Sequence, residues 1–244
     1  MKRFQFCTVL LLTSYLLLFT LANILVAAPV EERVGRFLVD EFNPERVSVQ
    51  ATEGGSFMYA HANGIDIEGM RLESISLYAL MKSDFPGSDL KDKDKYEIAD
   101  MIYMSRGELV ILEKDVHDYC RKEMEDIKGF RDMKIDFNKD GFKFSGVYTA
   151  KFLFTFNFRL SATARVSYDA NGLNLTDVKL FINNVQQPDS LSKLLTDKVN
   201  PLINPEKIPF PVKVTDIIYK DDRIVFTGHP QELGEGSQIW TYAR

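Results

Sequence analysis

The chain has few of the residues on which metal sites and nucleophilic catalysis depend: its 244 residues include three histidines and two cysteines. His61, His117 and His229 share no ligand spacing, so a zinc site is not expected. No metalloprotease helix, nucleophile elbow, phosphate loop or dinucleotide-binding glycine pattern occurs in the sequence. We therefore expect neither a cofactor nor an enzymatic activity.

Cysteine is too scarce to cross-link the fold. Cys7 falls in an N-terminal leader, which leaves Cys120 as the one thiol of the remaining domain. The fold must then be held by its core, without an internal disulfide. Cys120 and His117 lie three residues apart on a predicted helix and could pair as nucleophile and base. Because Cys120 falls on the apolar stripe of that helix, a buried packing thiol is the better interpretation.

An excess of positive charge is also missing. The chain has 30 Lys and Arg against 35 Asp and Glu, a net charge of −5. Without Lys2 and Arg3 of the leader the counts are 28 and 35, a net charge of −7. Nucleic acid is therefore not an expected partner, because phosphate contacts require a basic surface.

Charged residues are absent from residues 4–30, which follow Lys2 and Arg3. The Leu-rich part, residues 7–28, is long for a cleavable signal region and long enough for a membrane-spanning helix. We expect residues 1–28 to be a signal peptide or an N-terminal membrane anchor, and both remain open. In either case we expect the following domain to be exported to the periplasm or cell envelope.

The strongest positive feature is an alternation of apolar and polar residues over residues 150–168. Every even-numbered residue there is apolar, including Phe152, Phe154, Phe156 and Phe158, while the odd-numbered residues are nearly all polar. A period of two predicts a β-strand with one apolar face, roughly 60 Å long at about 3.3 Å per residue. Such a face needs a cover, which can be a helix, a second sheet or a lipid chain.

Other segments complete a sheet. Alternation and turn residues predict strands at residues 46–51, 65–77 and 173–182, and hairpins at residues 133–144 and 214–227. Breaks are expected at Gly69–Met70 and Glu73–Ser74. The apolar residues change parity near Asp177, which predicts a bulge that bends the sheet.

Three segments place apolar residues at helical spacing, namely residues 29–42, 112–127 and 191–202. The polar stretch 83–96 is predicted to be a loop, and residues 229–244 form a tail with little periodicity. We expect residues 29–228 to be one α+β domain. In it an elongated, strongly curved antiparallel sheet is closed by about three helices around an apolar interior.

The order and spacing of the C-terminal pieces resemble the LmeA family of bacterial envelope phospholipid-binding proteins. These pieces are residues 151–168, the turn 169–172, and residues 173–182, 194–203, 208–214 and 222–228. The resemblance covers roughly residues 34–228, and the chain departs from it in the insertion 83–96 and in its tail. It implies a barrel-like tube similar to the tubular lipid-binding folds, phospholipid binding and no catalytic residues.

The leading hypothesis is therefore a protein that binds a phospholipid or another acyl-chain amphiphile beside a membrane surface, for lipid carriage or envelope maintenance. The candidate lipid-binding residues are Phe152, Phe154, Phe156, Phe158, Leu160, Val166, Leu194 and Leu195. Two alternatives stay open. One is a structural module with a fully packed core that docks an unidentified envelope protein, and the other, weaker one is a lipid-modifying enzyme that uses unrecognised carboxylates.

Overall fold

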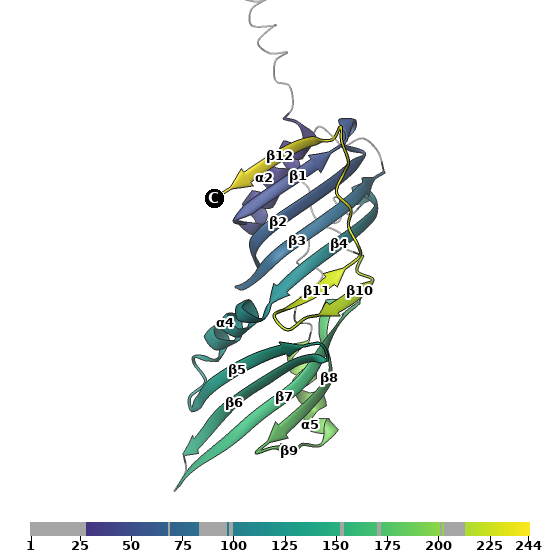
Figure 1. Cartoon of the computed structure of the whole chain (residues 1–244). Helices are drawn as coiled ribbons and strands as arrows, with labels where there is room; N and C mark the ends of the chain where they lie inside the picture. The colour runs from purple at the N-terminus through teal and green to yellow at the C-terminus, as the bar shows by residue number, and fades with distance from the viewer. Residues whose placement is uncertain are drawn as a thin grey trace, which may run out of the picture.

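The computed structural model describes residues 28–67, 69–82, 97, 100–151, 154–169, 172–200, 202 and 213–244. Its strands form two open antiparallel sheets that follow one another along an elongated molecule (Figure 1). The predicted leader up to residue 27, the predicted loop 83–96 and most of the segment 208–214 lie outside the described residues. Of the helices within the described ranges, none has the length and apolar character needed to cross a membrane.

Sheet A has seven strands in the order β10-β11-β4-β3-β2-β1-β12. Their bounds are Arg46–Ala51 (β1), Phe57–Ile67 (β2), Met70–Met81 (β3), Ile102–Leu112 (β4), Asp216–Tyr219 (β10), Arg223–Thr227 (β11) and Gln238–Ala243 (β12). The N-terminal and C-terminal parts of the chain therefore share one sheet. The predicted strand 46–51 is confirmed as β1, and the first expected break separates β2 from β3. The second expected break, at Glu73 and Ser74, is wrong, because strand β3 continues through these residues.

Sheet B is inserted between these two parts, with five strands in the order β5-β6-β7-β8-β9. Their bounds are Phe130–Asn138 (β5), Gly141–Lys151 (β6), Thr155–Asp169 (β7), Gly172–Ile182 (β8) and Val185–Gln186 (β9). As far as the described strands go, neither sheet closes on itself, because β10 and β12 end one sheet and β5 and β9 end the other. The antiparallel α+β prediction is confirmed, whereas the expected closure into a barrel-like tube is not.

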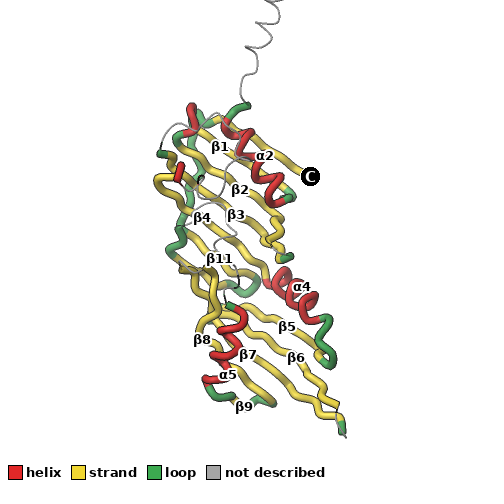
Figure 2. Tube along the Cα trace, turned by 180° about the vertical axis from the view of Figure 1, so that it is seen from behind, coloured by secondary structure: helices red, strands yellow, loops and turns green. Residues whose placement is uncertain are grey.

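The three predicted helices are confirmed, with ends that shift by up to three residues. They are Val30–Phe42 (α2), Glu113–Met124 (α4) and Asp189–Val199 (α5), and a short 3-10 helix, Glu53–Gly55 (η1), precedes β2. Helix α2 packs on β1, β2 and β12, while α5 packs on β8. Both lie on the same side of the molecule, and α4 contacts β3, β4 and β5 at the junction of the sheets (Figure 2).

The long strand predicted over residues 150–168 is wrong in one respect, because it contains a hairpin turn. Strand β6 ends at Lys151 and β7 begins at Thr155, and Ala150 pairs with Phe156. Paired residues of antiparallel strands point to the same face. An even-numbered residue here pairs with an even-numbered one, so the alternation runs through the turn unbroken. Periodicity alone could not reveal the turn.

The bulge predicted near Asp177 is confirmed. Thr163 pairs with Lys179, whereas Arg165 pairs with Thr176, so the register between β7 and β8 shifts at this point. Asp177 itself has a φ of 52°. A bulge bends its strand and increases the local twist, and this one lies close to the end of sheet B that adjoins sheet A.

The tail after Gly228, for which no periodicity predicts a structure, contributes an edge strand to sheet A. Strand β12 pairs with β1, and Trp240 lies opposite Val49. On helix α2, Gly35 is buried against the Trp240 ring so closely that a Cβ on Gly35 would lie 2.0 Å from Cε3 of the indole. The absence of a side chain at Gly35 is thus what lets the helix approach the sheet.

Replacing Gly35 tests this packing. Gly35→Leu forces the helix or the indole to move, and we expect it to lower the free energy of unfolding by about 2 kcal/mol, despite the better helix propensity of Leu. Urea denaturation measures the change. Gly234→Leu is the control, because a Cβ there meets nothing within 4 Å. Equal stabilities of the two variants would contradict the packing described.

Candidate functional site

An apolar cavity of about 120 Å³ lies where the two sheets meet. Sheet A contributes residues of β2, β3, β4 and β11, sheet B contributes residues of β5 to β8, and helix α4 forms a further wall. Its lining includes Ile111, Phe137, Phe142, Val166, Leu173 and Phe226. The apolar faces of both sheets therefore converge on one point beside α4.

From this cavity an apolar strip extends along β6 and β7. We define the strip by the even-numbered residues other than glycine between Phe142 and Ala150 on β6 and between Phe156 and Ala164 on β7, which share one face by their register: Phe142, Phe144, Tyr148, Ala150, Phe156, Phe158, Leu160, Ala162 and Ala164. Phe142 lines the cavity, so the strip and the cavity are continuous. Exposure rises away from the cavity, from 6% at Ala164 to 49% at Phe156.

The strip and the cavity can accommodate groups of different size. Small-molecule pockets typically have about 300–1,000 Å³, so the cavity alone is too small for a lipid. The strip between Ala164 and Phe156 is roughly 26 Å long at 3.3 Å per residue. One leaflet of a bilayer core is only about 15 Å thick, half of the whole. The strip is thus long enough for one extended acyl chain that ends at the cavity.

The predicted lipid-binding residues fall into distinct settings. Val166 is 8% exposed and lines the cavity. Phe158 and Leu160 are half-buried on the strip, and Phe156 lies near its outer end. The structure therefore brings four of the eight predicted residues together on one face of β7.

The other four predicted residues are not part of this group. Phe154 is 73% exposed beside the β6–β7 turn, and Phe152 lies outside the described residues. Leu194 is 56% exposed on α5, and Leu195 belongs to the same helix. The predicted helix contribution to the site is thus not seen at Leu194.

Sequence reasoning missed the part of the cavity that sheet A supplies. Ile111 of β4 pairs with Ile224 of β11, and both line the cavity. Strand β4 was not predicted, because Arg106, Gly107 and Glu108 interrupt its apolar run. The α4 residues at the cavity, Val116, Tyr119 and Cys120, do belong to the predicted apolar stripe.

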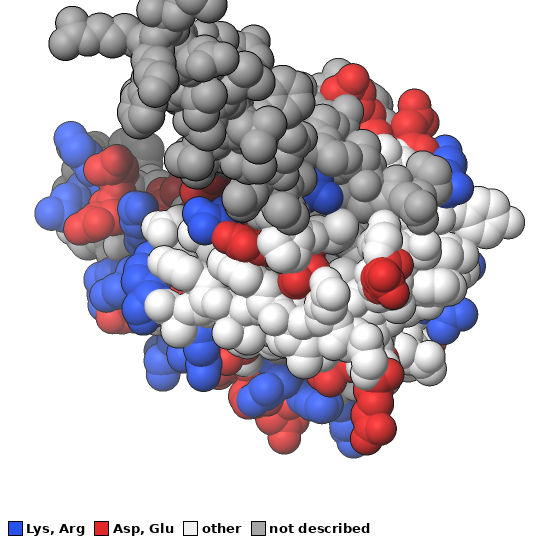
Figure 3. Space-filling model, turned by 90° about the horizontal axis from the view of Figure 1, so that it is seen from above, with Lys and Arg blue, Asp and Glu red and all other residues white. Residues whose placement is uncertain are grey.

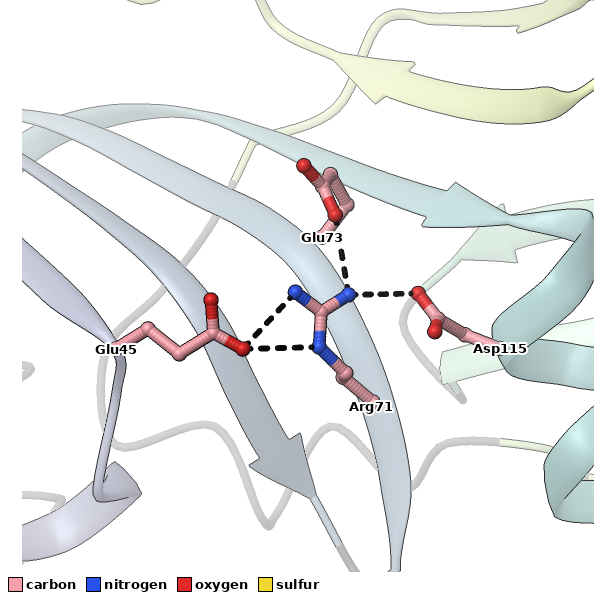
Figure 4. Close-up of polar contacts among 4 residues, drawn as sticks. All are labelled: Glu45, Arg71, Glu73 and Asp115. Atoms are coloured by element: carbon pink, nitrogen blue, oxygen red, sulfur yellow. Dashed lines mark hydrogen bonds and ion pairs between the residues drawn. The ribbon is translucent and has the colours of Figure 1, made fainter.

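Arg71 holds helix α4 against sheet A (Figure 4). Its guanidinium donates hydrogen bonds to Glu45 before β1 (3.1 Å), to Glu73 on β3 (3.0 Å) and to Asp115 in the first turn of α4 (3.0 Å). Burial acts to lower the pKa of Arg71, but the hydrogen bonds to Glu73 and Glu45 outweigh it and raise that pKa. Arg71 therefore stays charged and compensates the Asp115 carboxylate, which is only 7% exposed.

A polar groove of about 820 Å³ runs beside α4 and shares Tyr119 with the apolar cavity. Four basic and four acidic side chains line it, which are Arg71, Arg121, Lys122, Arg131, Asp115, Asp118, Glu125 and Asp132. Several of these charges form ion pairs with one another within the groove. Because the charges balance, the groove has no strong electrostatic preference for an anionic group.

Cys120 acts as a wall of the apolar cavity. Burial, with a smaller contribution from Glu123, raises the pKa of its thiol to about 11. A thiol that stays protonated at neutral pH is a poor nucleophile, which supports the packing interpretation of this residue. Within the described ranges, no cluster of three or more His, Cys, Asp or Glu side chains could hold a metal ion.

A family model described as LmeA-like phospholipid-binding matches residues 62–229, more than half of the chain. No curated protein and no solved structure matches the chain at a significant level. The matched range contains the cavity, the strip and all of sheet B. Helix α2 and strands β1 and β12 lie outside it.

Removing the cation at Arg71 should loosen α4. Arg71→Met leaves the Asp115 carboxylate buried without its partner, and because Arg71 is partly exposed we expect a loss of about 2 kcal/mol in the free energy of unfolding. Arg36→Met removes an exposed pair with Glu32 and should cost less than about 0.5 kcal/mol. Urea denaturation of both variants measures the difference. Equal losses would contradict the role given to Arg71.

The raised pKa of Cys120 predicts slow alkylation. Iodoacetamide attacks the thiolate, so the Cys120 peptide, followed by mass spectrometry, should react slowly at pH 8 and accelerate up to about pH 11. The pKa of this thiol is higher in the folded state than in the unfolded state. The free energy of unfolding therefore falls as the pH rises from the unfolded-state pKa to the folded-state pKa. A rate in the folded chain at pH 8 that matches the rate in urea would contradict the buried position.

Proposed function

The chain belongs to the LmeA-like phospholipid-binding family, and from this premise we propose that it binds one phospholipid, or a similar acyl-chain amphiphile, along the apolar strip. The observation that carries the proposal is the continuity of the strip with the cavity at Phe142. Both lie in the matched range. An acyl chain on β7 would cover the aromatic rings of Phe156 and Phe158, which stack at 6.5 Å.

The energetics suit reversible binding. Burying an acyl chain of about 16 carbons gains roughly 13 kcal/mol at about 0.8 kcal/mol per methylene. Association costs an estimated 4–15 kcal/mol in lost motion and ordering. Since the two quantities are of the same order, a single chain on the strip would bind and leave again. That behaviour fits a carrier better than a permanent structural lipid.

We place this activity outside the cytoplasm, in the periplasm or the cell envelope. The proposal rests on the uncharged segment 4–30, which has the features of a signal peptide or anchor. Membranes beside the exported domain would supply acyl chains. The role we propose is non-enzymatic, in lipid carriage or envelope maintenance, and a lipid on the strip would cover its exposed apolar residues.

Native mass spectrometry tests the proposal directly. The full chain is expressed for export, purified without detergent, and then extracted with organic solvent to identify any released lipid. We expect a mass increase equal to one phospholipid. A clean apo mass, together with no uptake of added phosphatidylglycerol, would contradict lipid binding and would leave a packed module that docks a protein.

A matched pair of variants locates the lipid. Phe156→Ser changes a half-exposed strip residue at little cost to folding, and we expect it to reduce the bound lipid roughly fivefold through lost apolar contact. Phe181→Ser is the control, because Phe181 pairs with Ser161 and so faces the opposite side of sheet B. Equal lipid loads in the two variants would contradict binding along the strip.

A further inference from the structure

The end of sheet B farthest from sheet A is apolar and exposed. Around the β6–β7 turn, Phe154 is 73% exposed, Phe156 49% and Tyr148 37%. Together with Lys151, the last residue of β6, we call these residues the tip. Figure 1 shows the joined ends of β6 and β7, which carry these residues, at the lower end of the molecule. Exposed aromatic groups gathered at one end of a domain mark an interaction surface.

Basic side chains accompany these rings. A surface recess of about 620 Å³ beside Tyr148 is lined by Lys128, Arg131 and Lys151 as well as by Phe130. The nearby carboxylate of Asp132 is paired with Arg131. Aromatic and basic groups thus lie together at this end of the molecule, in a combination that suits an interface between water and anionic lipid.

The charge of sheet B differs in sign from that of the whole chain. Residues 130–186 have eight Lys and Arg against five Asp and Glu, a net charge of +3 in a chain of −5, so the other residues sum to −8. Seen from the opposite end of the molecule, acidic and basic side chains are mixed around an uncharged patch (Figure 3). An anionic surface would therefore attract sheet B and repel the remainder, which orients the molecule tip first.

We propose that the tip docks on an anionic lipid bilayer. Phe154 and Tyr148 enter the interfacial region, while Lys128 and Lys151 contact the acidic headgroups. Phe156 belongs both to the tip and to the strip, so a lipid could pass from the bilayer onto β7 along a continuous apolar path. This last step rests on the function proposed above, whereas docking itself does not depend on it.

The single tryptophan of the chain makes docking measurable. Trp240→Phe removes it, and a second substitution, Phe154→Trp, then gives one reporter at the tip. The control reporter is Tyr103→Trp in the same Trp240→Phe background, because Tyr103 has the same exposed fraction, 73%, on β4 of sheet A. Both full-length variants are mixed with phosphatidylcholine vesicles that contain phosphatidylglycerol and brominated acyl chains. A local reporter makes the result independent of the N-terminal segment.

We expect strong quenching and a blue shift for the Phe154→Trp reporter and little change for the Tyr103→Trp reporter. High salt, or brominated phosphatidylcholine vesicles without phosphatidylglycerol, should abolish the quenching, since both remove the attraction to acidic lipid. Adding Lys151→Gln should weaken binding roughly fivefold, the usual effect of one basic residue near such a surface. Thr163→Gln, a polar change on β7 away from the tip, should leave the binding to vesicles unchanged.

The outcomes separate docking from lipid binding. Equal quenching of the two reporters overturns docking by the tip, and so does no quenching at position 154 in a chain that yields extractable lipid. Quenching that persists in high salt and on phosphatidylcholine vesicles comes from lipid on the strip and overturns the anionic-surface proposal. Salt-sensitive quenching at the tip, in a chain that neither carries nor takes up lipid, supports docking and contradicts the proposed function alone.

Discussion

The architecture depends on one constraint, which is that two apolar sheet faces must be covered, and the described part of the chain supplies helices α2, α4 and α5 for this. Helix α2 covers the β1, β2 and β12 part of sheet A, α4 closes the junction, and α5 packs on β8. Among the described residues these helices leave the outer part of β6 and β7 incompletely covered, as the exposure of Phe156 shows. Burial of apolar surface is the dominant favourable term in folding and association. An apolar ligand would therefore gain the most favourable free energy of burial on the uncovered strip.

Two contacts outside the strip fix the elements around it. Arg71 ties α4 to sheet A through three carboxylates, and Trp240 locks β12 onto α2 at Gly35. The second contact uses elements outside residues 62–229, the range that the family model matches. The matched range carries the strip and the cavity.

Local sequence patterns predicted most individual helices and strands. The turn between β6 and β7 and the lining of the cavity depend on strand register, which those patterns do not give. Helix α2, strand β1 and the bulge at Asp177 follow from spacing and parity alone. The turn between β6 and β7 is invisible to parity, because Ala150 pairs with Phe156. The sheet A wall of the cavity needs Ile111 beside Ile224, a pairing of residues far apart in the sequence that no single segment encodes. Four of the predicted lipid-binding residues lie together because they occupy alternate positions of β7. The same alternation identified them in the sequence.

The proposed binding mode places an acyl chain along the strip with one end at the cavity. The most direct test is photocrosslinking with a phospholipid that carries a diazirine on its acyl chain, followed by peptide mapping of the labelled full chain. We expect label on β6 and β7, at or between Phe142 and Phe156, and at the cavity residues of α4. Label spread over the outer face of sheet B or confined to sheet A would contradict it.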